Sequence, residues 1–152
     1  MIHSQNSKAV ISTLPISVSS ASSAEIEVDT LGFDYVQTYV FFGALAAAHT
    51  ELKMTSSDTS GGTFTAVLTA ATDNTIAAAT STFPAADDDN KIWLFEFPTS
   101  ACKRYVKLES TVASGACLVA ALTILSRASG ESSLATASER GCEEILRVPV
   151  PA

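Results

Sequence analysis

The sequence predicts an all-β fold, an antiparallel, jelly-roll-like β-sandwich with a C-terminal extended arm. Many short segments alternate apolar and polar residues or are rich in β-branched and aromatic side chains. Clusters of Gly, Ser, Asp and Pro separate these segments, and no strong helical periodicity runs through them. We therefore expect one sandwich domain at residues 1–128, with an irregular loop at 70–90 and an arm at 129–152.

The first predicted strands lie near the N-terminus. Residues 8–14 form one strand, and residues 16–19 continue it past Pro15, which marks a sheet edge or a bulge because proline has no N–H to donate. Residues 25–30 alternate apolar and acidic side chains, as expected for a strand with one solvated face.

Two segments are apolar on both faces of the predicted strand. Residues 35–42 carry aromatic and β-branched side chains at odd and even positions alike, and residues 116–125 are apolar at nearly every position. Such a pattern is typical of strands that are covered on both sides. We expect this of both segments, and we expect residues 35–42 to be a central strand.

A turn is predicted at residues 57–62, whose composition is Ser-Asp-Thr-Ser-Gly-Gly. It joins predicted strands at residues 49–56 and 63–68, so these segments form a hairpin. His49 shares one face of its strand with charged side chains, which predicts that its imidazole points to solvent.

A second hairpin is predicted around residues 112–115, between strands at residues 103–111 and 116–126. The two strands flank a short, turn-like segment, and sequence neighbours joined in this way commonly pair. We therefore expect these strands to be antiparallel partners.

The three cysteines are Cys102, Cys117 and Cys142, an odd count without a closely spaced pair. In the second predicted hairpin, Cys117 faces Ser110 and Cys102 faces Leu125, so these two cysteines are not cross-strand partners. We expect reduced thiols that pack as small apolar residues, with Cys142 the candidate for an exposed one.

The strand predicted at residues 91–97 is rich in aromatic residues. Trp93, Phe95 and Phe97 share one face, and Glu96 lies on the other. Exposed aromatic side chains at this spacing form a platform for stacking sugars, whereas buried ones form a sandwich core. The core interpretation is favoured, because the opposite face is less bulky and ends in a charge.

Composition argues against two classes of partner. Only 16% of the residues are charged, the net charge is −7, and the basic residues are scattered rather than clustered. Binding to nucleic acid is therefore not expected.

The apolar stretches at 39–48 and 116–125 are about half as long as the ~20 residues of a membrane-spanning helix, so no membrane partner is expected. The N-terminus does not resemble a signal peptide, which predicts that the chain is made and used without secretion.

No enzyme motif is present, and we expect neither catalysis nor a cofactor. A general base at His49 has no nucleophile motif beside it. The metal candidates are Asp87, Asp88 and Asp89, since calcium prefers several oxygen ligands on a loop. The EF-hand spacing is absent, however, so we interpret these aspartates as a solvated loop.

The C-terminal segment differs in composition from the rest. Its apolar residues Ile145, Leu146 and Val148 are costly to leave in water, at about 1.5–3 kcal/mol for each large side chain. We expect an extended arm that packs on its own domain or on a neighbouring molecule. A short helix at residues 138–146 is the alternative.

Several motifs occur together in a familiar order. A Tyr/Val-rich strand at residues 34–42 precedes Glu-Leu-Lys-Met at 51–54 and Gly-Gly-Thr-Phe at 61–64. Lys-Arg-Tyr-Val-Lys-Leu at 103–108 then leads into the apolar segment at 116–125. This order resembles the small, jelly-roll-like head decoration proteins, or cement proteins, of tailed bacteriophages.

The resemblance covers about residues 26–128, and the motifs are mainly strand and turn chemistry. The chain departs from the family pattern in its Ala-rich connection at 44–48 and in a longer tail past Ser129. The resemblance implies a virion structural protein, made in the host cytoplasm, that binds the major capsid protein on the outer capsid surface and ties adjacent capsomers together. It also implies a homo-oligomer, a trimer or a dimer, and no catalytic residues.

The candidate interface residues are apolar side chains on the predicted central strands and the arm. They are Tyr39, Phe41, Phe42, Leu118, Ile145, Leu146 and Val148. Two other functions remain open for this fold class: a carbohydrate- or receptor-binding module, and a phage head-completion or tail component.

Overall fold

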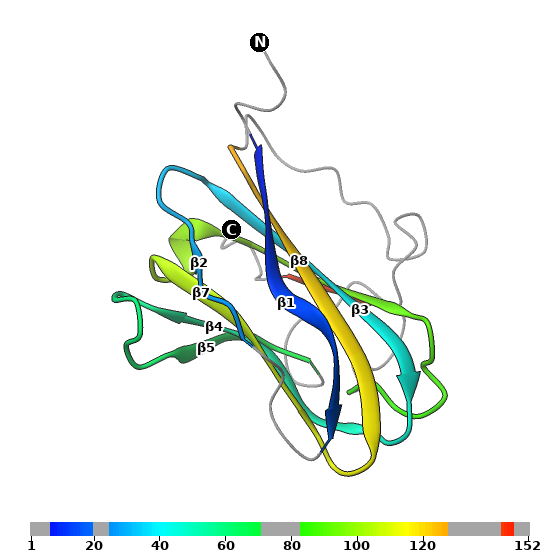
Figure 1. Cartoon of the computed structure of the whole chain (residues 1–152). Coiled ribbons are helices and arrows are strands. Elements are labelled where there is room, and N and C mark those ends of the chain that lie inside the picture. Colours follow the sequence, from blue (N-terminus) through cyan, green and yellow to red (C-terminus); the bar gives the residue numbers. More distant parts are fainter. Residues whose placement is uncertain (1–6, 20–24, 71–82, 128–143, 148–152) are drawn as a thin grey trace.

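The computed structural model describes residues 7–19, 25–70 and 83–127, together with the backbone of residues 144–147. It is a sandwich of two β-sheets (Figure 1). The five-stranded sheet has the order β1 (Ser7–Ser19), β8 (Ala116–Ser126), β3 (Tyr35–Leu45), β6 (Ile92–Pro98) and β9 (Glu144–Arg147). The four-stranded sheet has the order β2 (Val28–Asp29), β7 (Tyr105–Val112), β4 (His49–Ser57) and β5 (Thr65–Thr69). The predicted all-β sandwich is confirmed.

The strands pair in a nested order, in which the first strand pairs with the eighth, the second with the seventh, and so on inward. β1 pairs with β8, β2 with β7, β3 with β6 and β4 with β5, and every one of these pairs is antiparallel. The turn between β4 and β5 is at the centre of this order. β8 also pairs with β3, and β7 also pairs with β4, which joins the pairs of strands into two sheets. This nested order is that of a jelly roll.

The first predicted hairpin is confirmed, because β4 and β5 pair on either side of the turn that contains Gly61. The second is wrong. β7 and β8 lie in different sheets, so the chain crosses from one sheet to the other between them, with Gly115 in a positive-φ conformation that favours glycine. Cys117 consequently pairs with Val18 and Leu45 rather than with Ser110.

The expectation of two covered faces is also wrong for β3 and β8. Both strands lie inside the five-stranded sheet, and in each one alternate residues are buried while their neighbours remain accessible. Phe41 is 40% exposed and Leu118 is 48% exposed. The second apolar face of these strands is therefore an outer surface of the sandwich.

The core lies between the two sheets and is built from the inward-facing residues of both. Trp93, Phe95 and Phe97 are at most 1% exposed, which confirms the core interpretation of β6. The ring of Trp93 meets Phe42 edge to face, with 5.2 Å between centroids. The other large side chains that are fully buried in the core include Leu52, Met54, Leu108 and Leu125.

Several expectations at the ends of elements are settled or fall outside the described residues. β1 runs through Pro15, which lies within the register shift between Thr13 and Ile16, as expected of a bulge. The strand predicted at 25–30 is confined to Val28–Asp29.

β9 pairs in parallel with β6, so this part of the arm adds a strand to its own domain rather than forming the alternative helix. Residues 71–82 of the predicted loop, residues 128–143 and Val148 lie outside the described residues.

A buried hydrogen bond links two central strands of the five-stranded sheet. The hydroxyl oxygens of Thr38 and Thr123 lie 2.8 Å apart, and both side chains are fully buried. The two residues are directly paired between β3 and β8. Each hydroxyl therefore satisfies the other inside the apolar core.

Replacement of Thr38 by valine removes one hydroxyl and leaves the other without its partner. We expect the free energy of unfolding to fall by about 1–3 kcal/mol in Thr38→Val and in Thr123→Val. The double variant removes both polar groups at matching shape, so it should lose clearly less than the sum of the two single variants. Urea unfolding of all four proteins measures this coupling, and strictly additive losses would contradict it.

Candidate functional site

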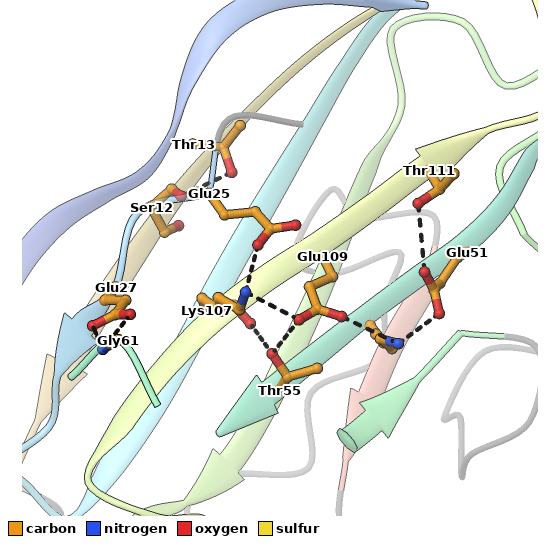
Figure 2. A network of polar contacts seen from close by, with 11 residues as sticks. Ser12, Thr13, Glu25, Glu27, Glu51, Thr55, Gly61, Lys107, Glu109 and Thr111 are labelled. Carbon is orange, nitrogen blue, oxygen red and sulfur yellow. Dashed lines mark hydrogen bonds and ion pairs between the residues drawn. The ribbon is translucent and has the colours of Figure 1, made fainter. Parts of the chain in front are cut away.

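The outer face of the four-stranded sheet carries a connected network of charges (Figure 2). Lys107 Nζ lies 2.6 Å from Glu25 and 3.2 Å from Glu109. Lys53 Nζ lies 3.1 Å from Glu109 and 2.5 Å from Glu51. The lysines and glutamates thus alternate across neighbouring strands, as cross-strand pairing of β4 with β7 requires.

These contacts shift the ionisation of the groups that make them. The hydrogen bond that Lys53 donates to Glu51 raises the pKa of Lys53, with Glu109 adding to the effect. Partial burial opposes ionisation of Glu109, but the two lysines outweigh it and lower its pKa. Thr55 also donates a hydrogen bond of 3.1 Å to Glu109. The charges on this face are already paired with one another, so a partner would have to compete for them.

The outer face of the five-stranded sheet is apolar where β1, β8 and β3 meet. Ile11, Leu118 and Phe41 are each 40–51% exposed. An open groove with a volume of about 380 Å³ runs between β1 and β3 over β8, and its walls include Ile16, Phe41 and Leu118. Clusters of exposed apolar side chains on a small protein mark interaction sites.

Small residues line part of the groove, and Leu118 packs over the backbone of Gly43. Gly43 and Ala120 line it, and a Cβ atom added at Gly43 would lie 3.0 Å from the Cβ of Leu118. On the β1 side, Pro15 lies within the register shift between Thr13 and Ile16 in the pairing with β8. The sequence therefore builds a depression in this face rather than a flat sheet.

Three of the predicted interface residues lie together on this face. Tyr39, Phe41 and Leu118 belong to β3 and β8, on the side of the sheet opposite the core. Phe42 does not join them, because adjacent residues of a strand point to opposite faces. Its side chain is 3% exposed and packs in the core, although the residue is also among those that line the groove.

At β6, the residues on the outer face of this sheet are largely buried. Glu96 lies on the outer face as predicted, but its side chain is fully buried. Its carboxylate accepts a hydrogen bond of 2.5 Å from Gln37. Ile145 and Leu146 lie in β9, at the edge of the sheet beyond β6 and away from the groove.

The acidic loop, which we define as residues 87–89, is tied to the protein by two of its own carboxylates. Asp88 accepts a hydrogen bond of 2.8 Å from the Ala85 N–H and pairs with Lys91 at 2.9 Å. Asp89 accepts the Leu45 N–H at 2.7 Å. Within the described part of the chain, no group of three or more His, Cys, Asp or Glu side chains is arranged to hold a metal ion. Asp88 and Asp89 thus have structural roles in the loop.

His49 is buried, which contradicts its predicted exposure. The pairing of β4 with β7 shifts register between His49 and Glu51, so the alternation that the sequence suggests is broken there. The imidazole is 3% exposed and lies 4.9 Å from the Phe42 ring, between centroids. Neither ring nitrogen has a hydrogen-bonding partner among the described residues. Burial lowers the pKa of His49 to about 4.

The two cysteines that the structure describes are free thiols. Cys117 is fully buried in the core, as predicted for a small apolar residue. Cys102 is partly buried, and burial raises its thiol pKa to about 11, so it stays protonated at neutral pH. Cys142, the candidate for an exposed thiol, lies outside the described residues.

Comparisons with protein-family models, with curated proteins and with solved structures found no match. No helix with the length and apolar character of a membrane span occurs among the residues that the structure describes. The two outer faces of the sandwich differ: one carries paired charges, and the other has an open apolar groove.

The buried imidazole of His49 predicts a pH-dependent stability. The folded state keeps His49 neutral down to a pKa of about 4, whereas the unfolded imidazole takes up a proton near pH 6.5. The free energy of unfolding should therefore fall as pH decreases from about 6.5 to about 4, by up to about 3 kcal/mol. His49→Leu keeps the apolar volume and removes this titration.

Urea unfolding of the wild type and of His49→Leu at several pH values measures the difference directly. All other titrating groups are shared, so their effects cancel in the difference between the two proteins. We expect the variant to gain stability relative to the wild type as pH falls through this range. Parallel curves for the two proteins would contradict the assignment.

Proposed function

We propose that this chain is a virion structural protein, a capsid decoration or cement protein that binds the major capsid protein on the outer shell and ties adjacent capsomers together. The observation that carries the proposal is the open apolar face over β1, β8 and β3. The resemblance of the strand and turn motifs to phage head decoration proteins supports the same function.

The contrast between the two faces supports a role in binding. Removing apolar surface from water contributes about 25 cal/mol per Å², so a partner that covers Ile11, Phe41 and Leu118 gains free energy. The network of Lys53, Lys107 and Glu109 on the other face offers no such gain, because its charges are already paired. We infer that the five-stranded sheet faces the shell.

The chemistry of the described residues supports a non-enzymatic role. The groove is lined almost entirely by apolar side chains, with Ser17 the only hydroxyl among its lining residues. General acid–base catalysis needs a titratable group within reach of a substrate. His49, the histidine in the described part of the chain, is buried against Phe42 and away from solvent.

A cement protein does not need a tight individual site. Many copies on a repeated lattice, or several contacts within one oligomer, combine modest affinities into stable attachment. A homo-oligomer, a dimer or a trimer, is therefore part of the proposal. The sugar-binding alternative depended on exposed aromatic residues of β6, and Trp93, Phe95 and Phe97 are buried. No described feature favours a tail or head-completion component.

Quantitative mass spectrometry of purified particles from the virus or strain that encodes this chain tests the proposal. We expect many copies per particle, in a fixed ratio to the major shell protein, because cementing repeats across the lattice. A few copies per particle would indicate a connector or tail part. Absence from the particles would contradict a virion function.

A further inference from the structure

We propose that the groove between β1 and β3 binds an extended segment of the partner protein, which inserts an apolar side chain into the groove and places a lysine or arginine beside the acidic loop. The inference rests on the proposed function and specifies the chemistry of the partner. Four observations support it: the shape of the groove, its connection to the acidic loop, the local charge, and the lack of a suitable cation among the described residues of a second copy of this chain.

The groove fits an inserted side chain better than a flat surface. Its floor includes Ala120, which has a short side chain, and the backbone of Gly43, over which Leu118 packs. Phe41 and Leu118 rise beside this floor and are about half exposed. An apolar side chain from a partner would contact floor and walls together, which is the arrangement of an anchor residue in a binding interface.

The acidic loop is attached to the end of the same groove. The Asn90 N–H donates a hydrogen bond of 3.2 Å to the carbonyl of Gly43, which lines the groove. One residue earlier, Asp89 accepts the Leu45 N–H at 2.7 Å. These bonds fix the loop against the groove end of β3, so a segment that lies in the groove continues toward the loop.

The acidic loop has more carboxylates than nearby cations to pair with them. Lys91 pairs with Asp88, which leaves Asp87 and Asp89 as acidic groups without a cation among the described residues. The side chain of Asp87 is exposed. A basic residue at the end of the inserted segment would complement this charge, whereas an acidic one would be repelled.

Among the described residues, a second copy of this chain offers no free basic side chain near the groove. Most of the described basic side chains are ion-paired: Lys53, Lys91, Lys103, Arg104 and Lys107. Lys8 and Arg127 lie at the opposite end of the sheet from the groove. Lys8 pairs with Leu125, whose side chain is in the core. The Lys8 side chain therefore points to the face of the sheet opposite the groove. Arg127 donates to the Gly32 carbonyl at 2.8 Å.

Binding to undecorated shells, assembled from the major capsid protein of the encoding virus, tests the inference with two matched pairs of variants. Leu118→Ser truncates a groove wall, and Leu31→Ser truncates a leucine that is 66% exposed elsewhere. Asp87→Lys reverses a charge of the acidic loop, and Asp34→Lys reverses an exposed charge near the opposite end of the sheet. All four side chains are accessible, and circular dichroism verifies that each variant is folded.

We expect Leu118→Ser to weaken shell binding by about tenfold or more and Leu31→Ser to leave it within about twofold of the wild type. Asp87→Lys should weaken binding by about threefold or more and reduce its salt dependence, unlike Asp34→Lys. A photoreactive residue in place of Leu118 should cross-link to a shell peptide that contains an apolar residue and a nearby lysine or arginine.

The failures of the two proposals are distinguishable. The groove inference is overturned, and the decoration function stands, if Leu118→Ser and Asp87→Lys both bind shells as well as the wild type does. The same conclusion follows if the cross-linked peptide has no basic residue. If the wild type forms an oligomer in solution that Leu118→Ser dissociates, a second copy occupies the groove and the inference is overturned. Failure of the wild type to bind shells overturns the decoration function together with the inference.

Discussion

The nested antiparallel pairing of the strands is the constraint on which the rest of the structure depends. β1 pairs with β8 and β3 with β6 in registers that follow from this nested order, which is centred on the β4–β5 turn. This pairing assigns each strand to a sheet and each alternate residue to the core or to a surface. The core residues of β6 and the outer residues of β3 are placed by the same register.

The same pairing gives the sandwich two unlike outer faces. On the four-stranded sheet it brings Lys53 opposite Glu109, so the charges neutralise one another within the protein. On the five-stranded sheet it brings Phe41 opposite Ala120, beside Leu118, and leaves a groove with no charged lining residue. A sandwich needs only one apolar face on each sheet for its own core. The additional apolar face is the feature that a structural partner would cover.

Local patterns in the sequence predicted much of the fold, and the misses have physical causes. The strands, the β4–β5 hairpin and the buried face of β6 followed from alternation and turn composition, which are local. The partner of β8 did not, because a turn of the same composition either closes a hairpin or carries the chain to another sheet. His49 was misplaced because a register shift reverses the side that its position suggests. The outer face of β3 was expected to be buried, since an exposed apolar face has the same composition as a core face.

The most direct test of this account is the structure of a decorated particle, determined by electron cryo-microscopy. The account predicts that the chain lies on the outer shell with β1, β8 and β3 against the capsid protein, and that the charged face of β7 and β4 points to solvent. Contact through the face of β7 and β4, with Phe41 and Leu118 left exposed, would contradict it.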